Sequence, residues 1–367
     1  MSLHDRQSVD VSDTDETGPA DSPLEKALVR MAGNGPILEH GYFDHGPMAA
    51  EALEAMNLPG RIAPFVQRHV EAGGVRAAPG PAAPIRPRSW SGALGRPARY
   101  ADWVALIDAE MANLEWRALA RRWIVRLTPG AATAAVHGLI RTAHAVRALE
   151  RCDSPARRAE LVRALASWAS LYTPPPWAPI TARGRLSAQA AFDALAPAPI
   201  DLQAREGSIS AGLAKALNAP GFADQVAAVD TGGAVDARAD DVLQVFTSAF
   251  LDHARSPYTA IVWCHAITGA MSLRRLLGVM SEDEARALLT RLFEIGCAMK
   301  AAFDGLHATL DPGADMLDTP GRLAQRAADS GDDHAIKLTD ALLQAHHSSR
   351  CDDALRAADR GIRLLGA

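Results

Sequence analysis

The sequence predicts an all-α fold, either a multi-helix single domain or a closely packed helical bundle with irregular loops rich in proline and glycine. Three observations support this. Hydrophobic residues make up 48% of the 367 residues but aromatic residues only 5%. Alanine, the best helix former, supplies much of the apolar content. Apolar residues recur three and four positions apart in most segments, and no segment shows the alternation of a half-buried strand.

Local signals place the individual helices. Ser281 precedes an acidic first turn containing Asp283 and Glu284, which predicts an N-cap at this serine. Proline-rich chain over residues 73–98 and 172–180 should be irregular, because proline lacks a backbone donor and restricts its predecessor. Elsewhere we predict helices over residues 49–58, 61–71, 101–125, 130–151, 155–171, 208–217, 221–229, 238–254, 259–278, 281–303, 320–329, 332–346 and 351–364.

Residues 1–22 are polar and acidic, and we expect a disordered tail because they contain too little apolar surface to offset the entropy of ordering. Residues 23–367 are then expected to form one helical domain. There is no apolar run typical of a signal peptide or of a membrane span, which needs ~18 apolar residues. The four cysteines are scattered, as is usual in a reducing cytoplasm.

The charge distribution argues against nucleic-acid binding. Residues 1–26 contain seven acidic and two basic residues, which accounts for the whole net charge of −5. The rest of the chain, with 36 residues of each sign, is neutral and has no basic excess for a phosphate backbone or an anionic membrane.

Familiar catalytic motifs are absent from the sequence, so histidines carry the main chemical signal. There is no phosphate-binding Walker loop, GxGxxG, GxSxG or HExxH pattern. Imidazole is the commonest side-chain ligand of iron, zinc and copper. A lone histidine in an apolar segment is usually a hydrogen-bonded core residue, but five occupy such segments, which favours a metal site. They are His45, His137, His144, His265 and His334.

Helical spacing limits which of these can share one ion. His137 and His144 are seven residues apart, about 10.5 Å along a helix, whereas ligands of one ion lie ~3 Å apart. Both can face one cavity, but only one should bind the metal. His253 and His265 are too far apart for a shared ion, and His265 has the more apolar neighbours.

His334 and Lys337 are three residues apart and should project from the same helix face. Lys337 is one of only four lysines, against 34 arginines. It is either a solvated surface residue or a buried amine that can lose its proton or form a carbamate, which arginine does not readily do. Asp332 and Asp333 either cap this helix or accept a proton from a ligand histidine.

Four segments together resemble the questin oxidase-like family. They are HGPMAAEAL from residue 45, HGLIRTAHAVRAL over 137–149, CHAITGAMSLRRLL over 264–277 and DDHAIKLTDALL over 332–343, with NAPGFADQVA at 218–227 in support. They occur in the family's order and span about 300 residues, most of the chain.

This resemblance implies a helical non-haem iron oxygenase acting on an aromatic or polyketide-type carbonyl compound. The expected reaction is a Baeyer–Villiger-like oxidation or ring cleavage with molecular oxygen, with Fe(II), or zinc as the alternative, and with NADPH as a possible passing reductant. The implied ligand set is His45, His144, His265, His334 and Lys337, Lys337 being the expected catalytic group. The expected substrate pocket contains His137, Met48 and Trp263.

Two other classes of function remain open from the residues. The same cluster around zinc would make a metal-dependent hydrolase. A non-catalytic helical ligand-binding protein would instead keep its histidines as separate, hydrogen-bonded core residues.

Overall fold

A computed structural model describes residues 22–39, 41–73, 80–173, 180–196, 208–304 and 316–366. Across these ranges the chain forms sixteen α-helices and a few 3₁₀ turns, and the only β-type pairing is two isolated bridges. The predicted all-α fold is therefore confirmed. The predicted disordered tail, except for Ser22, and parts of both proline-rich segments lie outside the described residues.

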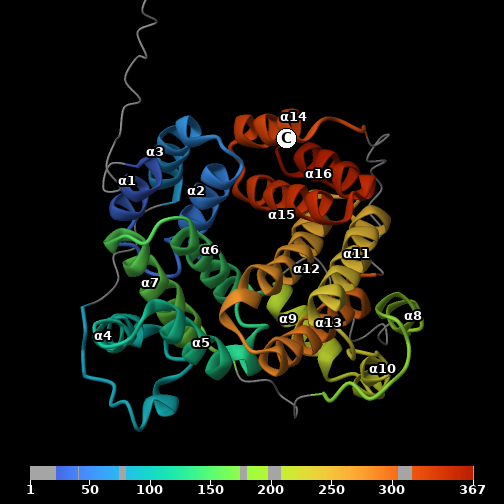
Figure 1. The fold of residues 1–367 in the computed structure, drawn as a ribbon, viewed down its shortest axis with the longest axis horizontal. Helices are drawn as coiled ribbons and strands as arrows, with labels where there is room; N and C mark the ends of the chain where they lie inside the picture. Colours follow the sequence, from blue (N-terminus) through green and yellow to red (C-terminus); the bar gives the residue numbers. More distant parts are fainter. Residues whose placement is uncertain are drawn as a thin grey trace, which may run out of the picture.

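The N-terminal and C-terminal halves of the chain form the two sides of the molecule in Figure 1. The first half contains α1 (Pro23–Arg30), α2 (Gly46–Ala55), α3 (Ile62–Gly73), α4 (Tyr100–Met111), α5 (Trp116–Leu127), α6 (His137–Arg151) and α7 (Pro155–Leu171). The second contains α8 (Ala188–Asp193), α9 (Ile209–Leu217), α10 (Phe222–Ala227), α11 (Val235–His253), α12 (Pro257–Leu276), α13 (Glu282–Phe303), α14 (Pro320–Ser330), α15 (Asp333–Ser349) and α16 (Asp352–Leu365).

The halves meet along four helices that pack in a closed cycle. Helix α2 packs on α6, α6 on α12, α12 on α15, and α15 on α2. These helices carry the four segments that the sequence singled out. No helix in the described ranges is long and apolar enough to cross a membrane.

Most predicted helices lie where the sequence placed them, with ends shifted by a few residues. Ser281 caps α13: its hydroxyl accepts a hydrogen bond from Glu284 N, and the Glu284 carboxylate accepts one from Ser281 N. The single helix predicted over 101–125 is two helices, because the Asn113 side chain bonds back to Ala109 O and competes with the helical ladder. Helices α1 and α8 were not predicted.

Helix α6 begins at His137, seven residues later than predicted. Ala134, Ala135 and Val136, which precede it, have positive φ angles of 48°, 53° and 71°. Non-glycine residues in this left-handed region cost roughly 1–3 kcal/mol each and are found where surrounding structure enforces them. The strained turn ends directly at a histidine, which indicates that it serves to place that residue.

Replacing Ala135 by glycine should stabilise the protein, because glycine adopts positive φ without steric cost. We expect the free energy of unfolding in urea to rise by about 1 kcal/mol. Ala143→Gly, inside α6, is the matched control and should lower stability by at least about 0.5–1 kcal/mol. A loss of stability in Ala135→Gly equal to that of the control would contradict the presence of strain in this turn.

Candidate metal centre

Four buried or half-buried histidines, one from each helix of the closed cycle, form a cluster in which His45, His137 and His334 lie together and His265 adjoins His137. His45 is the N-cap of α2, His137 is the first residue of α6, His265 lies within α12, and His334 is the second residue of α15. The Nε2 atom of His137 is 2.6 Å from Nε2 of His45 and 3.1 Å from Nε2 of His265. Ligand atoms of His45, His137 and His334 all lie within 4.8 Å of one another.

The other ring nitrogen of each histidine faces an acceptor. Nδ1 of His137 contacts Ala134 O, at the start of the strained turn, and Nδ1 of His265 lies 2.6 Å from Ile261 O. Asp333 Oδ1 lies 2.8 Å from Nδ1 of His45 and 2.9 Å from Nδ1 of His334. Carbonyl and carboxylate oxygens only accept hydrogen bonds, so Nδ1 carries the proton in all four rings.

Burial keeps three of these histidines neutral. It lowers the pKa of His45 to about 3, although Asp333 opposes this shift. It also holds the pKa of His137 and of His265 well below the ordinary value of 6.5, and the neighbouring histidines add to the effect. A neutral ring with its proton on Nδ1 has a lone pair on Nε2. The Nε2 lone pairs of His45 and of His265 therefore both face the Nε2 lone pair of His137.

Such an arrangement suits a bound metal cation. Two lone pairs at 2.6 Å repel each other, and a positive charge between them removes the repulsion. With metal–nitrogen bonds near 2.1 Å, neighbouring ligand atoms lie about 3 Å apart, which is close to the separations found here. Asp333 and the two carbonyl oxygens lie where, in known metal sites, outer partners fix the tautomer and orientation of ligand histidines.

The sequence left two roles open for Asp332 and Asp333, which were to cap the helix or to accept a hydrogen bond from a histidine. In the structure each aspartate has one of these roles. Asp332 caps α15 by accepting a hydrogen bond of 2.7 Å from Ala335 N. Asp333 bridges His45 and His334. Burial disfavours the charge on Asp333, but its contacts with the two histidines outweigh this and hold its pKa well below the usual range.

Lys337 is buried beside the cluster, with only 3% of its surface exposed. Its pKa is lowered by burial, against the opposing effects of Asp333 and Cys264, and its charge contributes to the lowered pKa of His45, His137 and His265. The reading of Lys337 as a solvated surface residue is therefore excluded. It does not line the adjoining cavity.

The cluster opens onto a cavity of about 1220 Å³. All four histidines line it, so His137 is a pocket residue as well as a member of the cluster. The other walls combine aromatic and aliphatic side chains with one arginine and a few small or polar residues. They include Phe43, Phe65, Tyr42, Tyr258, Ile37, Leu38, Ile209, Ile261 and Arg68. Phe43 stacks on the His137 ring with the centroids 4.8 Å apart.

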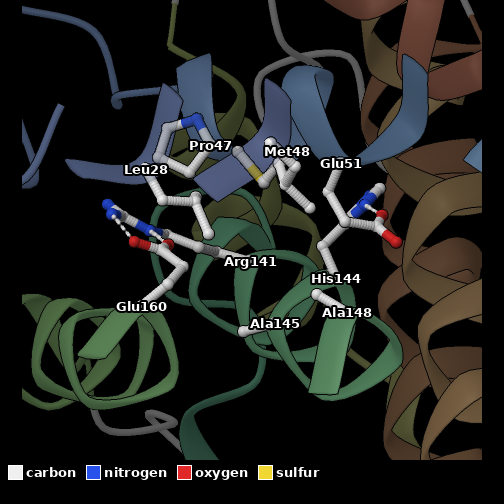
Figure 2. A pocket seen from close by; sticks show the side chains of 10 residues that line it. Leu28, Pro47, Met48, Glu51, Arg141, His144, Ala145, Ala148 and Glu160 are labelled. Atoms are coloured by element: carbon white, nitrogen blue, oxygen red, sulfur yellow. Dashed lines mark hydrogen bonds and ion pairs between the residues drawn. The ribbon is translucent and has the colours of Figure 1, made fainter. Parts of the chain in front are cut away.

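His144, predicted as a ligand, lies in a different group of side chains. Its Nδ1 is 2.6 Å from Glu51 Oε2, and its Nε2 accepts a hydrogen bond of 3.0 Å from Arg275. Figure 2 shows His144 of α6 beside Glu51 of α2. Both ring nitrogens are thus engaged, and His144 has no lone pair left to face the histidine cluster. This corrects the predicted placement, with His137 at the position expected for His144.

The His144 contacts belong to a closed ring of buried side chains, which we call the charge ring. Arg275 also bonds Asp340 Oδ2 at 2.7 Å. Arg147 completes the ring with bonds of 2.8 Å to Asp340 Oδ2 and 2.8 Å to Glu51 Oε1. Every member is at most 9% exposed. The order around the ring is Glu51, His144, Arg275, Asp340 and Arg147.

Met48 and Trp263, predicted as pocket walls, do not line the large cavity. Met48 adjoins a void of only about 10 Å³ between α1, α2, α6 and α7 (Figure 2). Trp263 is two residues from His265, about 200° around the helix, so it faces away and stacks on His253. In their places the cavity has Phe43, Phe65 and Tyr258, which the sequence analysis did not single out.

No family model matches the chain, and no curated protein is detectably similar to it in sequence. The resemblance to the questin oxidase-like family therefore rests on the four segments themselves.

The charge ring should make stability depend on pH in mildly acidic solution. Burial and Arg275 lower the pKa of His144 to about 4 in the folded chain, from the ordinary histidine value of 6.5. The unfolded chain therefore binds a proton first as pH falls, and this one group should remove about 3 kcal/mol of unfolding free energy between pH 7.5 and 4. Glu51 and Asp340, whose folded pKa values are lowered, add further losses at still lower pH.

Urea denaturation at several pH values, on wild type and on His144→Gln, isolates this contribution. Between pH 6.5 and 4 the free energy of the variant should fall less steeply, by up to about 1.4 kcal/mol per pH unit. Identical slopes in the two proteins would show that His144 is not a neutral buried group.

Proposed function

We propose that His45, His137, His265 and His334 bind one Fe(II) ion and that the protein is a non-haem oxygenase. The observation that carries this proposal is the convergence of Nε2 lone pairs from neutral, buried histidines at the wall of a large cavity. Neutral imidazoles suit iron, zinc and copper alike. Iron is the ion expected from the resemblance described above, with zinc as the alternative.

A bound iron ion with an open position supplies Lewis acidity and one-electron chemistry with molecular oxygen. The remaining roles belong to the protein. Asp333, Ala134 O and Ile261 O hold the imidazoles in the required tautomer, and aromatic and aliphatic side chains line the cavity beside them. The N-termini of α2, α6 and α15 lie at the cluster and present positive helix ends, which favours an anionic reacting group such as an enolate or phenolate.

The cavity supports an aromatic substrate of more than one ring. Its volume exceeds the roughly 300–1000 Å³ of ordinary small-molecule pockets. Phe43, Phe65, Tyr42 and Tyr258 offer ring faces, and Arg68 offers a cation for a carboxylate or phenolate. Lys337 lies beside the ligands, where its amine either balances the charge of Asp333 or forms a carbamate.

The proposed reaction is a Baeyer–Villiger-like insertion beside a carbonyl. One oxygen atom of O₂ enters a carbon–carbon bond: that bond breaks and two carbon–oxygen bonds replace it. The second oxygen atom leaves as water, with two electrons from NADPH and two protons, one from NADPH and one from solvent. The chain has no dinucleotide-binding glycine motif, so NADPH is proposed as a passing reductant. The four free cysteines are compatible with a reducing cytoplasm.

The metal assignment predicts which histidines are needed for metal content. Protein purified without a metal-affinity step should contain about one metal ion per chain, and His265→Ala and His334→Ala should contain a small fraction of that by elemental analysis. His253→Ala is the matched control, because His253 pairs with Asp304 and stacks on Trp263 outside the cluster. Stoichiometric metal in both cluster variants, with unchanged helicity, would contradict the ligand assignment.

The oxygenase proposal predicts substrate-dependent oxygen consumption. With iron, NADPH and a hydroxyanthraquinone, an oxygen electrode should record one O₂ consumed per product formed. Ile209→Trp enlarges a cavity-lining side chain outside the histidine cluster, and it should weaken anthraquinone binding by at least about tenfold, or 1.4 kcal/mol, while metal content stays unchanged. Stoichiometric zinc with ester hydrolysis and no oxygen uptake would instead establish the hydrolase.

A further inference from the structure

The charge ring and the histidine cluster are built from the same four helices. Helix α2 contributes His45 and Glu51, and α15 contributes His334 and Asp340. Helix α6 contributes His137 to the cluster and both His144 and Arg147 to the ring. Helix α12 contributes His265 and Arg275.

The two groups lie at different levels of this bundle. In every helix the histidine precedes the ring residue, by six to ten residues in the sequence. At 1.5 Å per residue this places the ring about 9–15 Å further along each helix. Each helix therefore runs from the cluster towards the ring and is held at both levels.

The ring bonds have the strength and direction needed to fix these helices. Arg147 and Arg275 each donate charge-assisted hydrogen bonds to Asp340, and such bonds are short, directional and strong in a dry interior. A carboxylate or guanidinium that loses its partner there is costly. Sliding or rotating one helix relative to the others would break at least two of these contacts.

We infer that the charge ring is the positioning element of the metal centre, setting how closely the four histidine Nε2 atoms approach one another. This inference rests on the proposed metal site. Metal-binding constellations need their ligands held within roughly 0.5 Å of the working geometry. The ring links all four ligand-bearing helices in one closed set of bonds, so it can meet that requirement without touching the metal.

The ring is itself no second metal site. Glu51, His144 and Asp340 have ligand atoms within 4.8 Å of one another. However, two guanidinium groups already occupy the space among them and satisfy their oxygens. The guanidinium groups of Arg147 and Arg275 supply the positive charge that balances the carboxylates of Glu51 and Asp340.

Another buried ion pair provides a matched control. Arg141 of α6 bonds Glu160 of α7 at 2.7 Å and 3.1 Å, with Glu160 4% exposed. Helix α7 carries no ligand histidine, so this pair stabilises the fold without joining two ligand-bearing helices. If burial and stability alone mattered, Asp340→Asn and Glu160→Gln would affect metal binding alike.

The experiment titrates apo protein with Co(II), whose visible absorption reports both affinity and ligand geometry. Wild type should bind one Co(II). Asp340→Asn should raise the Kd at least about tenfold, a loss like that seen when groups that orient metal ligands are removed, because the helices no longer hold the histidines in the working geometry. It should also change the absorption spectrum. Glu160→Gln should keep the wild-type spectrum and a Kd within about twofold, even where its urea stability falls equally.

Arg275→Lys provides a second variant in case Asp340→Asn does not fold. Lysine keeps the positive charge but cannot hold His144 and Asp340 together in a fixed fork, so the Kd should again rise and the spectrum change. Wild-type affinity and spectrum in a folded ring variant would overturn the inference while leaving the metal site intact. Equal weakening in Glu160→Gln would also overturn it. Absence of Co(II) binding to wild type would instead refute the proposed metal site and the inference with it.

Discussion

The structure depends on one electrostatic constraint, which is that uncharged imidazole lone pairs must meet in a buried space. Because the rings of His45, His137 and His265 are buried, adding a second proton to any of them is unfavourable. Because Nδ1 of each ring faces a hydrogen-bond acceptor, the single proton stays on Nδ1 and does not lie on Nε2 between two rings. A cation between the Nε2 atoms of His45 and His137, which lie 2.6 Å apart, would remove the repulsion between their lone pairs. Both the proposed chemistry and the surrounding architecture follow from meeting this requirement.

Three sets of groups, at increasing distance from the histidine cluster, satisfy this constraint. Directly behind the rings, Asp333 and two backbone carbonyl oxygens set the tautomers. One turn of chain away, the left-handed residues before α6 put Ala134 O against His137. Further along the bundle, the charge ring joins the helices that carry the histidines. The positive φ angles of Ala134, Ala135 and Val136 cost stability. The packing of the surrounding structure holds these residues in that conformation.

The sequence was sufficient for the fold class and for most helix positions. These depend on local signals such as caps, apolar spacing and proline, which is why the Ser281 cap and α13 were found. The break at Asn113 was missed because asparagine is only a mild helix breaker and its competing bond to Ala109 O depends on local geometry. The late start of α6 was missed because nothing in an alanine-rich segment signals positive φ.

The candidate site was only partly predictable. His45, His265 and His334 do come together, and spacing showed that His137 and His144 cannot both belong. Choosing between those two required knowing which end of α6 faces the cavity, and that is set by tertiary contacts. One signal was available: His144 is followed three residues later by Arg147, and each of the other segments also contains a charge among alanines and leucines. Charges repeated in four apolar segments indicate a buried ionic network beside the histidines.

The most direct test of the account is X-ray absorption at the metal edge on protein purified without added metal. The expected result is one iron ion per chain, surrounded mainly by imidazole nitrogens at about 2.1 Å, with the multiple-scattering pattern of histidine rings. An ion coordinated only by oxygen or sulfur, or protein that contains and binds no stoichiometric metal, would contradict it.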